Sequence, residues 1–332
     1  MNVKELIRTI NHTLKSHNLF PENSRILVAC SGGPDSMALL YLLQDIATHR
    51  HTTYKIGVAI VDHCIRPESK DEVLWLKHQV EELGLPFYSA TFDVPRLSKE
   101  YKKSEETIGR QVRYQWLTEI AQSEGYDYIS VAHHKDDQAE SILAHIIRGS
   151  GLNGLTGMSV VQSEYAIPVV RPLLDVTKEN LLAYIGTKQI SYCVDSTNDD
   201  VRYQRNRIRH RIIPELEAVN PAVVDAIVRL GSSVNEDVMV ISDLTSRTFD
   251  KLVSIGKDEV SISRRALRQE PLAIQRRLWQ RLVSTIDSDL TLTSAHQEQL
   301  LDIVNTGEKK TFTIKSIKVI AQCDTIKVYC KH

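Results

Sequence analysis

Short runs of β-forming residues alternate with helical stretches between residues 25 and 147. The runs RILVAC, YKIGVAIVD, PFYSATFDV and YDYISVAHH begin at residues 25, 54, 86 and 126, and each is followed by a segment typical of a helix. Strands separated by helices pair in parallel, because each connection crosses over the sheet. The sequence therefore predicts an α/β fold with a doubly wound, mainly parallel sheet. Ligands bind beyond the carboxyl ends of such strands, so the residues after Cys30, Val61 and Ala132 are the first candidates.

The pattern changes after Gly149. RGSGLNGLTGM (148–158) predicts a loop, and YAIPVVRPLLDV (165–176) predicts a strand that runs into a turn. Helical patterns dominate from about residue 201 to 305, with one β-like run, DEVSISRRAL (258–267). The tail (309–330) alternates apolar and polar residues, as antiparallel strands do. We expect a catalytic domain over 1–215 and a smaller, mostly helical domain over 216–332 that ends in short antiparallel strands.

Composition excludes several classes of protein. The formal net charge is −1, so a nucleic acid would have to bind a local basic patch. The N-terminal segment has apolar residues at helical spacing and predicts an amphipathic helix, not a signal peptide, and no later segment is apolar enough to span a bilayer. The cysteines are scattered and form no C-x-x-C, which argues against a disulfide framework or a zinc ribbon: Cys30, Cys64, Cys193, Cys323 and Cys330. We expect a cytoplasmic protein.

The motif SGGPDS (31–36) lies between the first predicted strand and the first predicted helix of the sheet. It lacks the lysine of a Walker loop and the G-x-G-x-x-G of a dinucleotide site, and too few residues precede it for a hydrolase nucleophile elbow. Gly32 and Gly33 allow the backbone to approach an anion, and the amides of the next helix point at the same place. The motif predicts a pyrophosphate site, with Asp35 holding Mg²⁺. The alternative is a Gly-Pro turn in which Asp35 caps the helix.

SGGPDS resembles the PP-loop of the N-type ATP pyrophosphatases, which cleave ATP between the α and β phosphates and adenylate a substrate. Other stretches resemble motifs of one branch, the tRNA(Ile)-lysidine synthetases: VDHCIRPES, EETIGRQVRYQWL, AHHKDDQAESIL, RGSGLNGLTGM, RPLL and DSTNDDVRYQRNRIRHRIIP. The chain departs from the pattern at Ile65, Gly109 and Ser141, where Leu, Ala and Thr are usual. The resemblance is strong over residues 24–215 and weakens beyond them.

The resemblance implies that ATP binds at the loop and at the ends of the second and fourth predicted strands. His63 is expected to border the adenosine or to pack in the core, and His133 to contact the nucleotide or to orient Asp137. The zinc spacing H-E-x-x-H is absent. The expected ATP-binding residues are Ser31, Gly32, Gly33, Pro34, Asp35, Ser36, Asp62, His63 and His133.

Asp137 and Glu140 lie three residues apart near the start of the helix predicted over 136–148, so they share one face. The expected buried stripe of this helix consists of Ala139, Ile142, Leu143, Ile146 and Ile147. The two acids could complement the helix dipole, or they could bind an ammonium group. The resemblance implies the second, because the family's other substrate is free L-lysine, and it leaves open which acid serves as the base.

The arginines form the local basic patch that the neutral net charge requires. On the helix predicted over 105–123, Arg110 and Arg113 lie one turn apart, opposite an expected stripe of Ile108, Val112 and Trp116. A solvated basic face is one interpretation; the resemblance implies instead that Arg113 is catalytic and meets phosphate. In the run 202–211, Arg205, Arg209 and His210 cannot all share one helical face with Arg207, so some of these residues are expected to form internal salt bridges. The expected contacts to tRNA or phosphate are Arg110, Arg148, Arg205, Arg207 and Arg209.

The resemblance implies a ligase that uses ATP and Mg²⁺. It joins L-lysine to carbon 2 of the wobble cytidine in the CAU anticodon of tRNA(Ile), through an adenylated cytidine, with Asp35, Arg113, Asp137 and Glu140 as catalytic residues. The modified anticodon reads AUA in place of AUG and its tRNA carries Ile in place of Met. The family also allows a homodimer. Two alternatives stay open: a tRNA thiolation enzyme of the same superfamily, and a tRNA-binding protein without activity.

Overall fold

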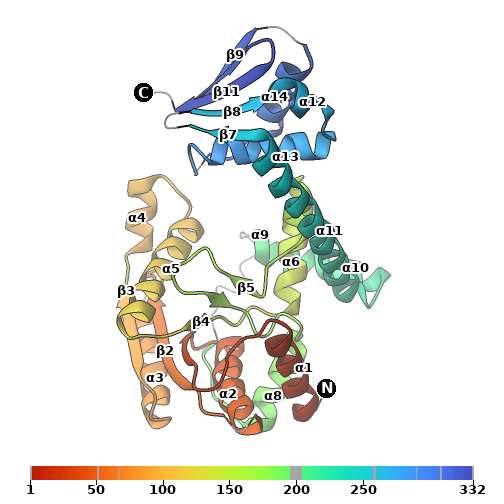
Figure 1. The fold of residues 1–332 in the computed structure, drawn as a ribbon. Helices are drawn as coiled ribbons and strands as arrows, with labels where there is room; N and C mark the ends of the chain where they lie inside the picture. Colours follow the sequence, from red (N-terminus) through yellow and green to blue (C-terminus); the bar gives the residue numbers. More distant parts are fainter. Residues whose placement is uncertain are drawn as a thin grey trace. The chain divides into compact units, whose positions relative to one another are not determined.

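The computed structural model describes residues 2–50, 52–66, 68–194, 204–256, 259–288, 290–306 and 309–330 (Figure 1). The chain divides into two compact units, Met1–Ser233 and Val234–His332. The domain boundary expected near residue 215 lies inside a short helix, α10 (Ile213–Val219). The point of division lies within the long helix α11 (Val223–Leu252).

The first unit contains a six-stranded sheet in the order β3-β2-β1-β4-β6-β5. All of its neighbouring strands are parallel except β5 and β6, which are antiparallel. The strands are β1 (Arg25–Ala29), β2 (Lys55–Asp62), β3 (Phe87–Thr91), β4 (Tyr128–Ser130), β5 (Val161–Gln162) and β6 (Val169–Val170). The predicted mainly parallel, doubly wound sheet is confirmed.

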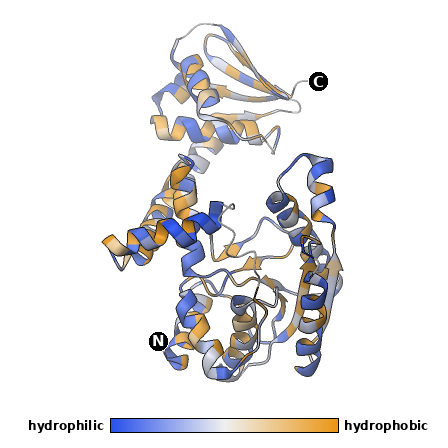
Figure 2. Ribbon diagram, turned by 180° about the vertical axis from the view of Figure 1, so that it is seen from behind, coloured by the Kyte–Doolittle hydropathy of each residue, from blue (hydrophilic) through white to orange (hydrophobic). Residues whose placement is uncertain are grey.

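Helices cover both faces of this sheet, because successive side chains of a strand point to opposite sides. Ile26 and Val28 of β1 belong to the apolar core that packs on α1 (Val3–Ser16), α2 (Pro34–His49), α3 (Ser69–Glu82) and α8 (Lys178–Lys188). Leu27 belongs to the core on the other face, where α5 (Glu105–Ser123) packs. The strands β1 and β2 are mostly buried, and hydrophobic and hydrophilic residues both occur along the helices of the molecule (Figure 2).

The strand order reverses between β1 and β4. The chain moves from β1 to β2 on one side of β1, and β4 pairs on the other side. At such a reversal the following connections leave in opposite directions and open a crevice at the carboxyl ends of the two strands. The loop at 31–36 follows β1, and His133 and His134 follow β4, so both meet at this crevice.

Two helices bury faces that match the expected ones only in part. In α5, Ile108 is buried as expected and Trp116 packs partly buried against the core, but the fully buried positions further along are Tyr114, Leu117 and Ala121 rather than Val112 and Trp116. In α6 (Lys135–Ile147), Ile146 and Ile147 are 47% and 54% exposed. Ala139 and Ile142 are buried as expected, and the same inner face of α6 contains two acids, Asp137 and Glu140, for the reason given below.

Besides α10, the described part of the first unit contains the short helices α4 (Val94–Tyr101), α7 (Leu152–Leu155) and α9 (Gln204–Arg207) and the π-helix η2 (Ile208–Ile212). The helix α7 lies within the Gly-rich segment that was predicted as a loop. Neither α4 nor α8 was predicted, and α8 contributes to the site.

The second unit is an antiparallel sheet with helices. Its order is β7-β8-β11-β10-β9, and every neighbouring pair is antiparallel. Its core is centred on the fully buried Trp279. The elements are β7 (Val253–Ile255), β8 (Glu259–Ser263), α12 (Arg264–Gln269), α13 (Leu272–Ser284), α14 (Ser294–Thr306), β9 (Lys310–Ile314), β10 (Ile317–Ala321) and β11 (Thr325–Cys330). The expected antiparallel strands at the end of the chain are confirmed. Within the described ranges, no helix has the length and hydropathy needed to cross a bilayer.

Candidate functional site

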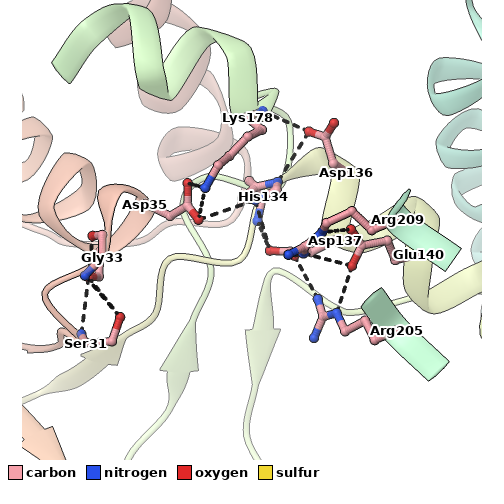
Figure 3. A network of polar contacts seen from close by, with 11 residues as sticks. Ser31, Gly33, Asp35, His134, Asp136, Asp137, Glu140, Lys178, Arg205 and Arg209 are labelled. Atoms are coloured by element: carbon pink, nitrogen blue, oxygen red, sulfur yellow. Dashed lines mark hydrogen bonds and ion pairs between the residues drawn. The ribbon is translucent and has the colours of Figure 1, made fainter. Parts of the chain in front are cut away.

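The loop at 31–36 is held in shape by its own hydroxyl groups. The Ser36 hydroxyl donates to the Gly33 carbonyl at 2.9 Å and accepts from the Ser31 amide at 3.2 Å. Pro34 occupies the start of α2, where a missing amide proton costs nothing, and Gly33 is the N-cap. Gly32 has a φ of +80°. The loop thus presents backbone to the crevice at the positive end of a helix, which is the geometry of an anion site (Figure 3).

Replacing Gly32 by alanine tests whether the loop backbone binds the nucleotide. A Cβ here would lie no closer than 3.5 Å to any neighbour, so the cost comes from the positive φ, about 1 to 2 kcal/mol of unfolding free energy. Gly84 is the matched control, because its φ is +66° and a Cβ would have no neighbour within 4 Å. We expect both variants to lose similar stability in urea titrations, and only Gly32→Ala to lose ATP affinity. Equal ATP affinity in the two variants would contradict this.

A cavity of about 350 Å³ opens beside the loop at the carboxyl ends of β1, β2 and β4. Its apolar lining includes Ala59, Ile60, Val61, Leu117 and Val131, and its polar lining includes Ser31, Gly33, Asp35, Ser36, His63, Arg113, His133, Lys178 and Arg209. An apolar slot joined to an anion-binding loop fits a nucleotide, because the base is flat and apolar and the phosphates are charged. Within the described part of the chain, no carboxylate forms an ion pair with Arg113, so its charge is available to an anion.

Two histidines of the cavity are neutral near pH 7. Burial lowers the pKa of His63 to about 4, and the charge of Arg113 contributes. Burial also lowers the pKa of His133 to about 3. The Nδ1 atoms of both rings are buried and have no hydrogen-bond partner among the described residues. Both rings therefore have a polar atom that a bound ligand can satisfy.

The depressed pKa of His63 predicts a pH dependence of stability. The unfolded chain takes up this proton near pH 6.5 and the folded chain only near pH 4, so the unfolded state binds more protons between those values. The free energy of unfolding is therefore expected to fall as the pH drops from 6.5 to 4. In His63→Gln the fall should be smaller by roughly 1 to 3 kcal/mol, whereas a glutamine at the exposed His12 should leave it unchanged. Urea titrations across this range measure the difference, and parallel curves for wild type and His63→Gln would contradict it.

Asp137 and Glu140 lie together, as predicted, and each contacts the same two arginines. Arg205 donates to Asp137 and to Glu140, both at 2.8 Å. Arg209 donates to Asp137 at 3.1 Å and to Glu140 Oε1 at 2.6 Å. We call these four residues the acid–arginine cluster (Figure 3). This cluster explains why α6 can bury two acids: the arginines neutralise carboxylates whose burial would otherwise be too costly.

The two sides of the cluster differ in exposure. The side chains of Glu140 and Asp137 are only 1% and 9% exposed, whereas those of Arg205 and Arg209 are 44% and 34% exposed. Burial opposes ionisation of Asp137, but the positive charges of His134 and Arg205 outweigh it and lower the pKa of this carboxyl. The two acids are buried, and the two arginines contact them from the solvent-exposed side.

The arginines predicted to contact tRNA or phosphate have different surroundings in the structure. Arg205 and Arg209 form the internal salt bridges that were expected for part of the arginine run, and Arg207 is exposed. Arg110 and Arg148 line a second cavity of about 510 Å³, together with Glu140, Arg171 and Arg205. His133 lines both cavities. Arg202 lies outside the described residues.

Asp35 has a partner that the sequence did not indicate. Lys178 Nζ lies 2.6 Å from each oxygen of its carboxylate, and His134 Nε2 lies 3.7 Å from one of them. Lys178 is the first residue of α8, whose N-cap is Thr177. The sequence Thr177-Lys-Glu-Asn before an apolar run is a helix start, and this signal could have located α8.

His134 connects three acids. Its ring lies 3.3 Å from Asp136, 3.5 Å from Asp137 and 3.7 Å from Asp35. Burial would lower the pKa of His134, but the three carboxylates outweigh burial and raise it. Asp137 also accepts a hydrogen bond from the His134 backbone amide at 3.0 Å. His134 was not among the predicted site residues, although its neighbour His133 was.

Asp62 has a structural contact in the turn after β2. Its Oδ1 accepts from the Cys64 amide at 2.8 Å and from the Ser69 hydroxyl at 2.7 Å. Asp62 does not line the cavity beside the loop, whereas the adjacent His63 does.

A divalent cation at Asp35 would need ligands from a bound molecule. No group of three or more His, Cys, Asp or Glu suitable for a metal occurs in the part of the chain that the structure describes. Asp35 offers carboxylate oxygens beside an anion-binding loop, and oxygen is the ligand that Mg²⁺ prefers. Asp35 could therefore hold a magnesium ion that arrives with phosphates.

Comparison with known proteins gives three kinds of match. A family model described as a PP-loop domain matches residues 3–216. Proteins named tRNA(Ile)-lysidine synthase match from Nostoc sp. (32% identity, 86% of this chain and 85% of the relative) and from Porphyromonas gingivalis (32% identity, 80% and 56%). This chain thus spans little more than half the length of the Porphyromonas relative. A U34-tRNA thiolase from Methanococcus maripaludis, with its [4Fe-4S] cluster, matches in structure with a TM-score of 0.59 and 20% identity, over 70% of this chain and 78% of that chain, which shows a common fold.

Proposed function

Because the chain belongs to the PP-loop family of tRNA(Ile)-lysidine synthases, we propose that it joins L-lysine to the wobble cytidine of tRNA(Ile) with a CAU anticodon. In the first step the cytosine O2 attacks the α-phosphorus of ATP, and pyrophosphate leaves. In the second step the ε-amine of lysine attacks carbon 2, loses a proton, and AMP leaves. The product reads AUA as Ile in place of AUG as Met.

The observation that carries this proposal is that two cavities share His133, and that each is also lined by one arginine of the acid–arginine cluster, Arg209 in the first and Arg205 in the second. The first cavity has the anion-binding loop and an apolar wall, as ATP requires. The second is lined by Arg110, Arg148 and Arg205, whose charges could meet RNA phosphate, and also by Glu106, Glu140 and Glu164. His133 lines both, and Glu140 lines the second. Two substrates in these cavities would meet beside Asp137 and Glu140.

The loop at 31–36 would bind the β and γ phosphates through its amides and hydroxyls. Asp35 would hold Mg²⁺ with the nucleotide, and the ion supplies charge neutralisation to the phosphates when bound. Arg113 lines the same cavity without a carboxylate partner among the described residues, so it would face the negative charge that develops on the α-phosphate. His63 and His133 would satisfy their buried Nδ1 atoms against the nucleotide.

The acid–arginine cluster supports a lysine site. Asp137 and Glu140 already contact two cationic groups in this structure, so their electrostatic environment suits cations. The ε-ammonium of lysine would replace one guanidinium, and because the arginine side chains are partly exposed, either can withdraw toward solvent. One of the two acids would orient the amine or take its proton.

Arginines other than Arg113 would bind the tRNA. Arg110, Arg148 and Arg207 would contact the tRNA backbone, and Arg205 and Arg209 would do so when they leave the acids. We place the protein in the cytoplasm, where tRNA is modified. A homodimer stays a prediction.

The test uses purified protein, a tRNA(Ile) transcript with a CAU anticodon, ATP and labelled lysine. We expect label in the tRNA, release of AMP and pyrophosphate, and no label in a transcript with a UAU anticodon. Incorporation of sulfur would instead support the thiolase alternative, for which the sequence has no C-x-x-C and the loop cysteine, Cys30, is buried with its pKa raised by burial. Binding of tRNA without any product would support the inactive alternative.

A further inference from the structure

Two lysines of α8 pair with two aspartates of α2. Lys178 at the start of α8 contacts Asp35 at 2.6 Å, and Lys188 at its end contacts Asp45 at 2.9 Å. Both are ion pairs of partly exposed side chains between the same two helices. They differ in their surroundings, because only Lys178 and Asp35 line the cavity beside the loop.

The backbone of Lys178 is held in place from three directions. Its amide donates to Asp136 of α6 at 2.8 Å. Thr177 caps the helix by accepting from the Asn180 amide. Further along α8, Leu181, Tyr184 and Ile185 lie in the apolar core with α2. Any movement of Lys178 is therefore confined to its side chain.

The ammonium group, in contrast, is free to change partner. The Lys178 side chain is 36% exposed and that of Asp35 is 27% exposed, so solvent reaches the pair. Lysine has a flexible stem and a compact charge that can move between nearby anions. Ser31 and Gly33 of the anion-binding loop line the same cavity, so a phosphate there would be a second anion close to Lys178 (Figure 3).

The Asp35 carboxylate cannot pair with Lys178 and bind a cation through the same two oxygens at the same time. In the structure its carboxylate has both oxygens on the Lys178 ammonium. With nucleotide bound, those oxygens would face the cation that accompanies the phosphates. A cation near Asp35 repels the ammonium, and the phosphates attract it, so both effects favour transfer of Lys178 from Asp35 to phosphate.

We propose that Lys178 is a phosphate-binding residue that exchanges partners: it neutralises Asp35 in the free protein and contacts the polyphosphate when the nucleotide is bound. This inference rests on the proposed use of ATP. Without nucleotide, the ammonium prevents Asp35 from opposing phosphate entry as an uncompensated negative charge. With nucleotide, the same charge stabilises the phosphate oxygens.

The first experiment compares ATP with adenosine, measured by calorimetry on the full chain. Lys178→Met is expected to weaken ATP binding about 10-fold to 100-fold, the range for loss of a charged hydrogen bond, and to leave adenosine binding unchanged because adenosine has no phosphate. Lys188→Met is the control, since it removes the other ion pair between α8 and α2. We expect it to leave the affinity for both ligands unchanged, and circular dichroism to show that both variants are folded.

The second experiment asks whether Lys178 acts on the nucleotide or only through Asp35. In an Asp35→Asn background the ammonium has no carboxylate to neutralise. If Lys178 contacts phosphate, adding Lys178→Met to Asp35→Asn still weakens ATP binding about 10-fold or more. If Lys178 serves only to neutralise Asp35, the added substitution has no effect on ATP affinity, and the inference is overturned.

The failure of this inference is distinguishable from failure of the proposed function. If the wild-type protein binds no ATP, the proposed function fails as well. If the wild type binds ATP and Lys178→Met binds it equally well, only the partner exchange is wrong. Equal losses for ATP and adenosine in Lys178→Met would also overturn it, since they would show general damage to the cavity.

Discussion

Replacing Arg205 and Arg209 together by alanine is expected to lower the free energy of unfolding of the first unit by about 3 to 5 kcal/mol. The double substitution leaves Asp137 and Glu140 buried without either guanidinium, and an uncompensated buried charge is among the most costly features of a folded chain. Hydrogen exchange of amides in α6, followed by mass spectrometry, reports this loss for the unit in question.

The same variant should recover stability in acid. Buried carboxylates without a cation have a raised pKa, so the folded state takes up protons before the unfolded state does. Stability then increases relative to wild type as the pH falls toward 4. Lys77→Ala serves as the control, because it breaks an exposed pair with Glu81 and is expected to cost less than about 1 kcal/mol. A double variant as stable as this control would show that the acid–arginine cluster does not hold α6 in place.

Asp137→Asn and Glu140→Gln are expected to abolish most lysine transfer, by on the order of 100-fold or more, because each removes a negative charge that would hold or deprotonate the amine. The first step does not involve lysine, so pyrophosphate release that depends on tRNA should persist. Quench-flow measurement of the two products separates the steps. Glu119→Gln, an exposed substitution on α5, is the control. Full lysine transfer in Asp137→Asn would exclude Asp137 from the site.

Local sequence patterns were sufficient to predict the sheet and the anion-binding loop. The runs that became β1 to β4 have apolar residues in strand-length segments, and the loop at 31–36 follows β1 directly. These features depend on neighbours in sequence, as do the bounds of α5, which agree with the predicted helix. The parallel direction of the strands followed from the alternation of strands and helices, whereas their order in the sheet was not predicted.

Long-range compensation of charge could not be predicted in detail. Ile146 and Ile147 were expected to be buried because they are apolar, but they are exposed. Asp137 and Glu140 are buried on the inner face because two arginines from a segment far along the chain, Arg205 and Arg209, contact them. The spacing of the two acids can be read from the sequence, but the sequence does not show which distant residues pair with them. Lys178 was missed for the same reason: its contact with Asp35 depends on how α8 packs on α2.

The proposed activity is the transfer of lysine to one defined cytidine. The most direct measurement is nuclease digestion of the treated CAU transcript, followed by mass spectrometry of the wobble nucleoside. We predict a nucleoside with the mass of cytidine plus lysine less one water, formed only when ATP, lysine and protein are all present. An unmodified cytidine after treatment with folded protein that binds both ATP and the tRNA would contradict the claim.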